Sequence, residues 1–128
     1  MHFCHKISVR FRDCDAMGHV NNAVYLTYLE EARFAHWRFV IGQTDPPDVI
    51  LARAEIDYRK AARYGDTLEI RIDVERIGTT SLSHTYVIDD QNGARIAEGR
   101  SVLVWYDYRA GTPVPIPDVV RSKISEST

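Results

Sequence analysis

The chain has little of what marks several protein classes, beginning with cysteine. Its 128 residues include two cysteines, Cys4 and Cys14, too few for a disulfide scaffold and without the close paired spacing of zinc or redox motifs. No apolar run is long enough for a membrane-spanning helix, and the first residues alternate polar and apolar types instead of resembling a secretion leader. We therefore expect a cytoplasmic protein without membrane insertion.

The chain also lacks an excess of charge of one sign. Its 16 basic and 18 acidic residues give a formal net charge of -2. A protein that binds along a nucleic acid needs a broad basic surface to neutralise many phosphates, so we expect no nucleic-acid partner. Most of the basic residues are arginine, however, and the arginine fork suits bidentate contacts to a few phosphates. A small nucleotide-bearing ligand is compatible with this composition.

The size and composition are those of one globular domain. Hydrophobic residues make up 45% of the chain and charged residues 27%, which is ordinary for soluble domains of this length. No internal repeat or low-complexity block divides the sequence. We predict a single domain over residues 1–128.

Alternating hydrophobic residues predict one strand near the start of the sequence and four strands in its second half. Ile7, Val9 and Phe11 alternate with polar residues, as in a strand with one buried face. Four further strands follow a proline-containing loop, and an Asn92-Gly93 pair marks a hairpin turn between the last two. Their predicted ranges are 50–60, 67–77, 80–89 and 94–107. The proline-rich remainder after Tyr108 reads as a surface tail.

Between the first two strands the spacing changes to that of a helix. Asn21 or Asn22 can cap it, and Gly42 ends it after about Ile41. Its inward face recurs every three or four residues, at Tyr25, Leu29, Ala32, His36 and Phe39. One helix on a mainly antiparallel sheet gives a two-layer α+β domain, with the sheet curled around the helix.

The densest polar cluster lies between the first strand and the helix, over residues 12–22. It sets Asp15 a few residues ahead of a helix start, where unpaired backbone N–H groups and the positive end of the helix dipole point outward. Such donors polarise a carbonyl or hold an oxyanion. A carboxylate beside them can act as a nucleophile or as a general base for water.

This segment carries a family resemblance. VRFRDCDAMGHVNNAVYLTYLEEAR, with its pattern D-x-D-x-x-G-H-V-N-N-x-x-Y-x-x-Y followed by E-x-A-R, closely resembles the signature of the 4-hydroxybenzoyl-CoA thioesterase-like family. Weaker matches follow in AEIDYRKAARYGDTLEIRIDVERIG and RIAEGRSVLVWYD, so the resemblance covers nearly the whole chain.

The resemblance implies a hotdog fold, in which a five-stranded antiparallel sheet wraps around one long helix. It implies hydrolysis of acyl-CoA to a free acid and CoA, with Asp15 as the catalytic carboxylate and the backbone N–H of Asn22 polarising the thioester carbonyl. No metal or other cofactor is required. It also implies a homodimer or homotetramer, joined through the strand predicted near residues 49–58, with each active site built from two chains.

Five further residues are assigned to substrate binding. His19, Asn21 and Tyr25 lie at or near the helix start, where the resemblance puts the acyl pocket, while Arg59 and Lys60 end a strand and suit the phosphates of CoA. Each has a structural alternative: His19 can shape the loop, Asn21 can cap the helix and Tyr25 can be core. Arg59 and Lys60 can be no more than solvated surface cations.

Other candidates in the cluster are given structural roles. Asp13 and Cys14 directly precede the catalytic position. Glu30 and Glu31 are considered because a second branch of hotdog thioesterases uses a mid-helix glutamate. Two other functions stay open. A hotdog hydratase or dehydratase would pair its aspartate with a histidine across an Asn-Pro loop, which is absent here, and a non-catalytic acyl-CoA-binding module would bind without turnover.

Overall fold

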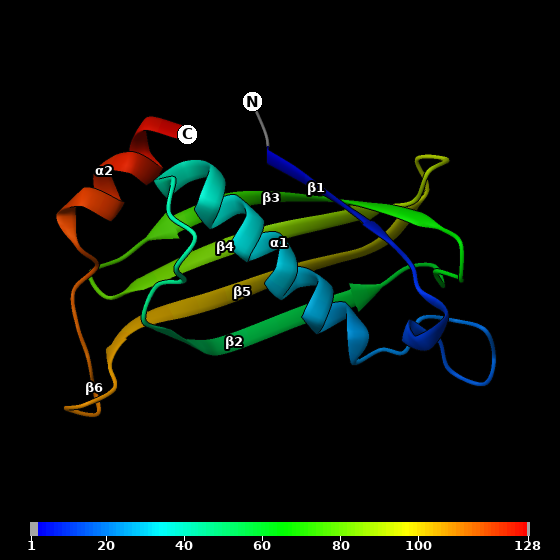
Figure 1. Ribbon diagram of the computed structural model, residues 1–128, viewed down its shortest axis with the longest axis horizontal. Helices are drawn as coiled ribbons and strands as arrows, with labels where there is room; N and C mark the ends of the chain where they lie inside the picture. The colour runs from blue at the N-terminus through cyan, green and yellow to red at the C-terminus, as the bar shows by residue number, and fades with distance from the viewer. Residues whose placement is uncertain (1–2, 128) are drawn as a thin grey trace.

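A computed structural model describes residues 3–127 (Figure 1), so both ends of the predicted domain 1–128 lie outside the described residues. Over residues 3–127 the chain is an α+β structure with two α-helices, six strands and one short 3-10 turn. These elements are β1 (Phe3–Ser8), the 3-10 turn (Phe11–Asp13), α1 (Val24–Ile41), β2 (Val49–Tyr58), β3 (Thr67–Ile77), β4 (Ser81–Asp89), β5 (Arg95–Asp107), β6 (Thr112–Pro113) and α2 (Asp118–Ser127).

The strands form one antiparallel sheet in the order β1-β3-β4-β5-β2, and β6 adds a two-residue pairing to β5. Helix α1 crosses one face of this sheet (Figure 1). The main core fills the space between them, because inward residues of α1 such as Tyr28 and Leu29 meet buried residues of β3, β4 and β5 such as Ile70, Ile88 and Ile96. The prediction of an antiparallel sheet packed on a long helix is confirmed.

The prediction of five strands and one helix is incomplete. Where a surface tail was expected, the chain forms β6 and then α2, which begins directly after Pro117. Val120 and Ile124, one helical turn apart, are buried in a second core cluster with Trp105 and Ile41. With only two inward residues among its ten, α2 shows little of the hydrophobic periodicity that predicts a helix. The prolines before it suggested a loop instead. Neither described helix is long and apolar enough to cross a membrane.

Two details of the first strand and the helix also differ from expectation. Strand β1 ends at Ser8 instead of continuing through Phe11, whose side chain is 78% exposed in the 3-10 turn and packs on the ring of Tyr64. Phe39, predicted on the inward face of α1, is 64% exposed and packs on Phe3. The N-cap of α1 is Ala23, not an asparagine.

A buried carboxylate ties the 3-10 turn that follows β1 to α1. Asp13 is 4% exposed, and its Oδ2 accepts hydrogen bonds from the Tyr28 hydroxyl (2.7 Å) and the Arg10 backbone N–H (3.1 Å). The Arg10 guanidinium lies 3.3 Å from Oδ1. Burial raises the pKa of Asp13, but the hydrogen bonds from Tyr28 and Arg10 together outweigh it and hold the pKa below its ordinary value. Asp13 thus has the structural role expected of it, and it fixes the loop that follows against α1.

We predict that Tyr28→Phe destabilises the protein by about 1–3 kcal/mol, because it removes a donor from a buried charged acceptor. Tyr25→Phe is the matched control. It lies one turn earlier on the same face, and its hydroxyl only accepts a 3.4 Å hydrogen bond from the Ala62 N–H. Urea unfolding of both variants measures the difference. A smaller loss for Tyr28→Phe than for Tyr25→Phe would show that Asp13 is held by other groups.

Two histidines are buried between α1 and the middle of the sheet. His84 on β4 is 3% exposed, and its ring lies 5.7 Å from that of His36 on α1. Burial lowers the pKa of His84 to about 3 and lowers the pKa of His36 as well. Both imidazoles are therefore neutral near pH 7.

We predict that stability falls as the pH drops below about 6.5, because the unfolded chain binds a proton at position 84 with an ordinary pKa while the folded protein does not until about pH 3. The stabilisation is complete above pH 6.5 and is lost progressively towards pH 3. Wild type should lose about 1.4 kcal/mol more per pH unit than His84→Phe in urea unfolding between pH 6 and 5. Equal slopes at matched protein concentration would refute the buried neutral histidine.

Candidate active site

A tight turn between β1 and α1 presents Asp15. The carbonyl of Asp15 accepts a hydrogen bond from the Gly18 N–H (3.0 Å), and its own N–H donates to the His19 carbonyl (2.8 Å). Gly18 has a φ of +80°, in the left-handed region that favours glycine. Asp-Ala-Met-Gly is therefore a turn sequence, with a polar first residue and a glycine that allows the chain to reverse.

The two oxygens of the Asp15 carboxylate have different surroundings. Oδ1 accepts backbone hydrogen bonds from Met17 (2.9 Å) and His19 (3.2 Å), which holds the side chain in the turn. Oδ2 accepts no hydrogen bond from any residue in the described range 3–127, and the side chain is exposed. One oxygen thus orients the carboxylate, as in many loop aspartates, and the other is left for a ligand.

Asp15 borders a cleft of about 290 Å³ between this loop, the start of α1 and the end of β2. The cleft brings together six of the seven residues that the sequence assigned to catalysis and binding, and adds Val20, Tyr58 and Ala61. The six are Asp15, His19, Asn22, Tyr25, Arg59 and Lys60. Asn21 is not among the lining residues.

The backbone N–H of Asn22 is an unused donor at this cleft. Its neighbours are engaged: the Asn21 N–H donates to the Asp13 carbonyl (2.9 Å), and the Ala23 N–H to Asn21 Oδ1 (3.0 Å). No described residue accepts from the Asn22 N–H. The Asn21 carbonyl points towards α1, where it accepts from the Val24 N–H (2.9 Å). Because C=O and N–H oppose each other across a trans peptide, the Asn22 N–H points away from the helix.

The other predicted binding residues divide into free and occupied side chains. The His19 imidazole is half-buried and bonds to no described residue; only its backbone shapes the turn. Tyr25 is 2% exposed and belongs to the hydrophobic core, and it also lines the cleft. The side-chain oxygen of Asn21 accepts a hydrogen bond from the Ala23 N–H. This side chain therefore fixes the backbone that leads into α1 and does not reach the cleft.

Tyr58, at the end of β2, is a site residue that the sequence analysis did not assign. Its hydroxyl donates to the Asn22 carbonyl (3.1 Å), and its ring lies 5.2 Å from that of Tyr25. It thereby holds the end of β2 against the start of α1. No local pattern signals this role, because it depends on two elements 36 residues apart in the chain meeting at the cleft.

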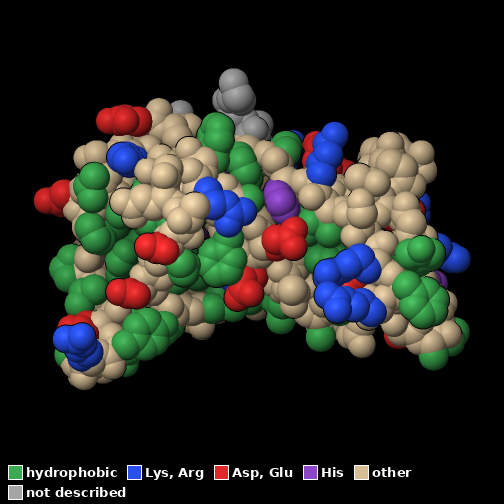
Figure 2. Space-filling view, viewed as in Figure 1, with side chains coloured by type: hydrophobic (Ala, Val, Ile, Leu, Met, Phe, Trp, Pro, Cys, Tyr) green, Lys and Arg blue, Asp and Glu red, His purple; other side chains and the backbone are tan. Residues whose placement is uncertain are grey.

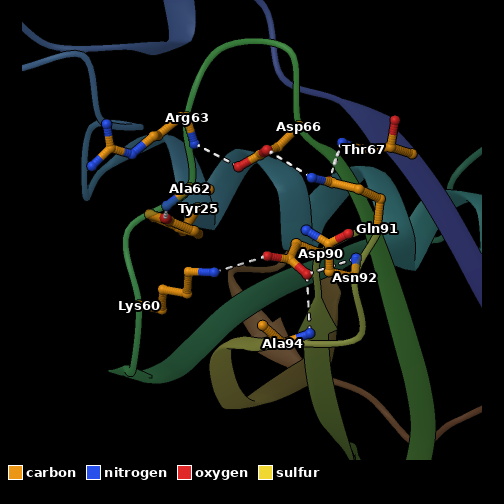
Figure 3. A network of polar contacts seen from close by, with 10 residues as sticks. All are labelled: Tyr25, Lys60, Ala62, Arg63, Asp66, Thr67, Asp90, Gln91, Asn92 and Ala94. Carbon is orange, nitrogen blue, oxygen red and sulfur yellow. Dashed lines mark hydrogen bonds and ion pairs between the residues drawn. The ribbon is translucent and has the colours of Figure 1, made fainter.

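The cations of the cleft are partly committed to other groups. Lys60 points to Asp90 (3.2 Å), a 7% exposed carboxylate that also accepts the N–H groups of the following turn (Figure 3). Arg59 Nε lies 3.3 Å from Glu98, and both side chains are exposed. The Arg63 guanidinium points away from Asp66 in Figure 3. Lys and Arg side chains gather where β2 ends (Figure 2).

The other acidic candidates do not line the cleft. Asp13 is buried against Tyr28, and Glu31 accepts a 2.7 Å hydrogen bond from His5. Glu30 is exposed on α1 and borders a different cavity. The Cys14 thiol faces the Arg10 carbonyl (3.8 Å). Within residues 3–127 no three His, Cys, Asp or Glu side chains form a group that could hold a metal ion.

The chain is similar to a predicted and a CoA-bound thioesterase of solved structure over nearly its full length. A predicted thioesterase from Bacillus stearothermophilus superposes with a TM-score of 0.88 at 32% identity, covering 98% of this chain and 96% of that one. A Thermus thermophilus thioesterase complexed with coenzyme A and Zn gives a TM-score of 0.85 at 34% identity, covering 96% and 91%.

A plant relative extends the likeness to thioesterases with a protein-bound substrate. The chloroplastic acyl-acyl carrier protein thioesterase ATL3 of Arabidopsis thaliana is 28% identical, over 93% of this chain and 66% of its own length. The family model of the Thioesterase-like superfamily matches residues 9–124, which include the Asp15 turn, all of α1 and the sheet except β1. This chain therefore belongs to the Thioesterase-like superfamily.

Proposed function

We propose that the protein hydrolyses acyl-CoA thioesters, as the resemblance to the 4-hydroxybenzoyl-CoA thioesterase-like family implies. Membership of the superfamily supports thioesterase activity in general. The observation that carries the finer proposal is the pairing of an oriented carboxylate, Asp15, with an unused N–H donor, Asn22, on the wall of one cleft. The coenzyme A bound to the T. thermophilus thioesterase, 34% identical to this chain, supports CoA as the thiol carrier.

The proposed chemistry needs only these two groups and water. The thioester carbonyl oxygen accepts the Asn22 N–H, which stabilises the negative charge that develops there. The free oxygen of Asp15 attacks the carbonyl carbon, the C–S bond breaks, and CoA leaves as a thiolate. Water then hydrolyses the acyl-aspartate anhydride and regenerates the carboxylate. A general-base route, with Asp15 activating water directly, uses the same position.

Arg59 is the better placed of the two residues proposed to bind the phosphates of CoA. Its ion pair with Glu98 is exposed at both ends, so a phosphate can replace that carboxylate at little cost. Lys60 is bound to the buried Asp90, and breaking that pair leaves a carboxylate without its cation. His19 and Tyr25 complete the proposed walls around the thioester.

We predict that Asp15→Asn lowers kcat for acyl-CoA hydrolysis by at least about 100-fold, because the carboxylate is lost while the shape is kept. Asn retains an oxygen for the Met17 and His19 N–H groups, so the turn and the unfolding midpoint should be preserved. Glu31→Gln is the matched control, since it neutralises a carboxylate on α1 that lines neither this cleft nor the other cavity beside α1. Thiol release by both variants is measured with a thiol reagent. Wild-type turnover by Asp15→Asn would refute the assignment.

The proposed functional unit is a homodimer or homotetramer joined through β2. This strand lies at one edge of the sheet, as expected, and its inner neighbour is β5 alone. Most of its residues are exposed, including Ile50 and Leu51, and hydrophobic side chains appear between the charged ones on the face that carries α1 (Figure 2). An unblocked edge of this kind pairs with another strand, and pairing with its symmetry mate gives an isologous dimer.

We predict that the purified protein sediments as a dimer or tetramer at micromolar concentration. Its specific activity should fall on dilution once dimers dissociate, because each site is proposed to contain groups from two chains. Analytical ultracentrifugation combined with activity measured over the same dilution series provides the test. A fully active species at the monomer mass of 14.7 kDa would eliminate the shared site. The cytoplasmic location stays a prediction.

A further inference from the structure

A second cavity, of about 270 Å³, lies between the C-terminal part of α1 and the sheet, and shares no lining residue with the Asp15 cleft. Most of its walls are apolar side chains of α1, β4 and β5, among them Trp37, Val40, Leu82, Leu103 and Trp105. Phe34 on α1 and Leu51 on β2 also line it and are 40% and 46% exposed. The cavity therefore opens between α1 and the edge strand.

Two neutral histidines interrupt this apolar lining. His84 Nδ1 is buried without a hydrogen-bond partner, and no described residue bonds to the other nitrogen of His84 or to either nitrogen of His36. Beside them, one guanidinium nitrogen of Arg33 donates to the Tyr86 hydroxyl (3.2 Å), which also bonds to Ser101. Besides the charged side chains of Glu30 and Arg33, the cavity wall thus offers unused donors and acceptors at the histidine pair.

An unsatisfied polar group inside a folded protein is costly and calls for an explanation. An apolar residue at position 84 would fit the lining of Leu82, Leu103 and Trp105 without this cost. Since both imidazoles are neutral, each presents one N–H donor and one acceptor nitrogen. The ligand group that matches is an uncharged hydroxyl, which both donates and accepts.

The shape of the cavity indicates an extended ligand. The lining residues of α1 run from Glu30 to Ile41, roughly 16 Å at 1.5 Å per residue. The volume corresponds to about nine groups the size of a water molecule. This suits an aliphatic chain of about eight carbons better than a single ring.

We propose that this cavity binds the acyl chain of the thioester substrate, and that this chain is aliphatic, of about eight carbons, with a distal hydroxyl that hydrogen-bonds to the His84 and His36 pair. The proposal rests on the proposed thioesterase function.

The proposed dimer explains how a chain reaches this cavity from the Asp15 cleft. Val49 and Leu51, at the start of β2, line the cavity, whereas Tyr58, at the end of the same strand, lines the cleft. When two β2 strands pair antiparallel about a two-fold axis, the start of one lies beside the end of the other. Each cavity then adjoins the cleft of the partner subunit.

A charged end group would meet one charge of each sign on the cavity wall. Glu30 borders the same cavity, so a second carboxylate would be repelled there. The Arg33 guanidinium, the one described cation on the lining, donates through Nη1 to Tyr86 and keeps its positive charge, which would attract a carboxylate. A dicarboxylic chain is therefore the informative competitor.

The test measures binding without turnover, by titrating octanoyl-CoA, 8-hydroxyoctanoyl-CoA and the mono-CoA ester of suberic acid into the intact Asp15→Asn protein. We expect the hydroxylated chain to bind about tenfold more tightly than octanoyl-CoA, and also more tightly than the suberyl ester. Adding His84→Phe should bring the ratio of the first two affinities to about one. Val40→Trp, which fills the cavity from α1, should weaken octanoyl-CoA at least tenfold, and Phe39→Trp, on the exposed face, should not.

Three results would overturn the proposal: equal affinities for the plain and hydroxylated chains, preference for the suberyl ester, or unchanged octanoyl-CoA affinity in Val40→Trp. The last variant keeps the test valid if His84→Phe fails to fold. Failure of the thioesterase proposal looks different, because wild-type protein would then bind the hydroxylated chain selectively and release no thiol.

Discussion

The hydrogen bond between Tyr28 and the buried Asp13 carboxylate is the contact on which the candidate site depends. It fixes the last residue of the 3-10 turn to the second turn of α1, with Arg10 closing the other side. The loop that follows is then anchored at both ends, by Asp13 and by the start of the helix. Within it, backbone hydrogen bonds hold one oxygen of Asp15, and the direction of the Asn22 N–H is set by the Asn21 carbonyl, which points towards α1.

The same arrangement explains why two aspartates two residues apart have different roles. Asp13 is buried, fully bonded and charged, which makes it an anchor. Asp15 is exposed on the wall of the cleft, and only one of its two carboxylate oxygens accepts hydrogen bonds from described residues. Local backbone geometry separates them, since the 3-10 turn rotates Asp13 inward and the Gly18 turn carries Asp15 outward. A carboxylate that is oriented without being neutralised is what the proposed attack on a thioester requires.

The sequence predicted the parts of the fold that repeat, and missed those that depend on tertiary contacts. Regular alternation predicted the observed bounds of β3, 67–77, and Gly42 correctly marked the end of α1 at Ile41. Helix α2 was missed because its burial rests on two residues packing against Trp105. The cleft residues around Asp15 were found through a continuous motif, and Arg59 and Lys60 as cations at a strand end. Tyr58 and the His36 and His84 pair belong to elements that meet only in the folded chain, so no local spacing signals them.

The most direct test of the central claim is a crystal structure of the Asp15→Asn protein with an intact acyl-CoA bound. The account predicts the thioester carbonyl oxygen within hydrogen-bond distance of the Asn22 N–H and the carbonyl carbon next to the side chain at position 15. A thioester bound instead beside Glu30, with the Asp15 turn facing solvent, would contradict it.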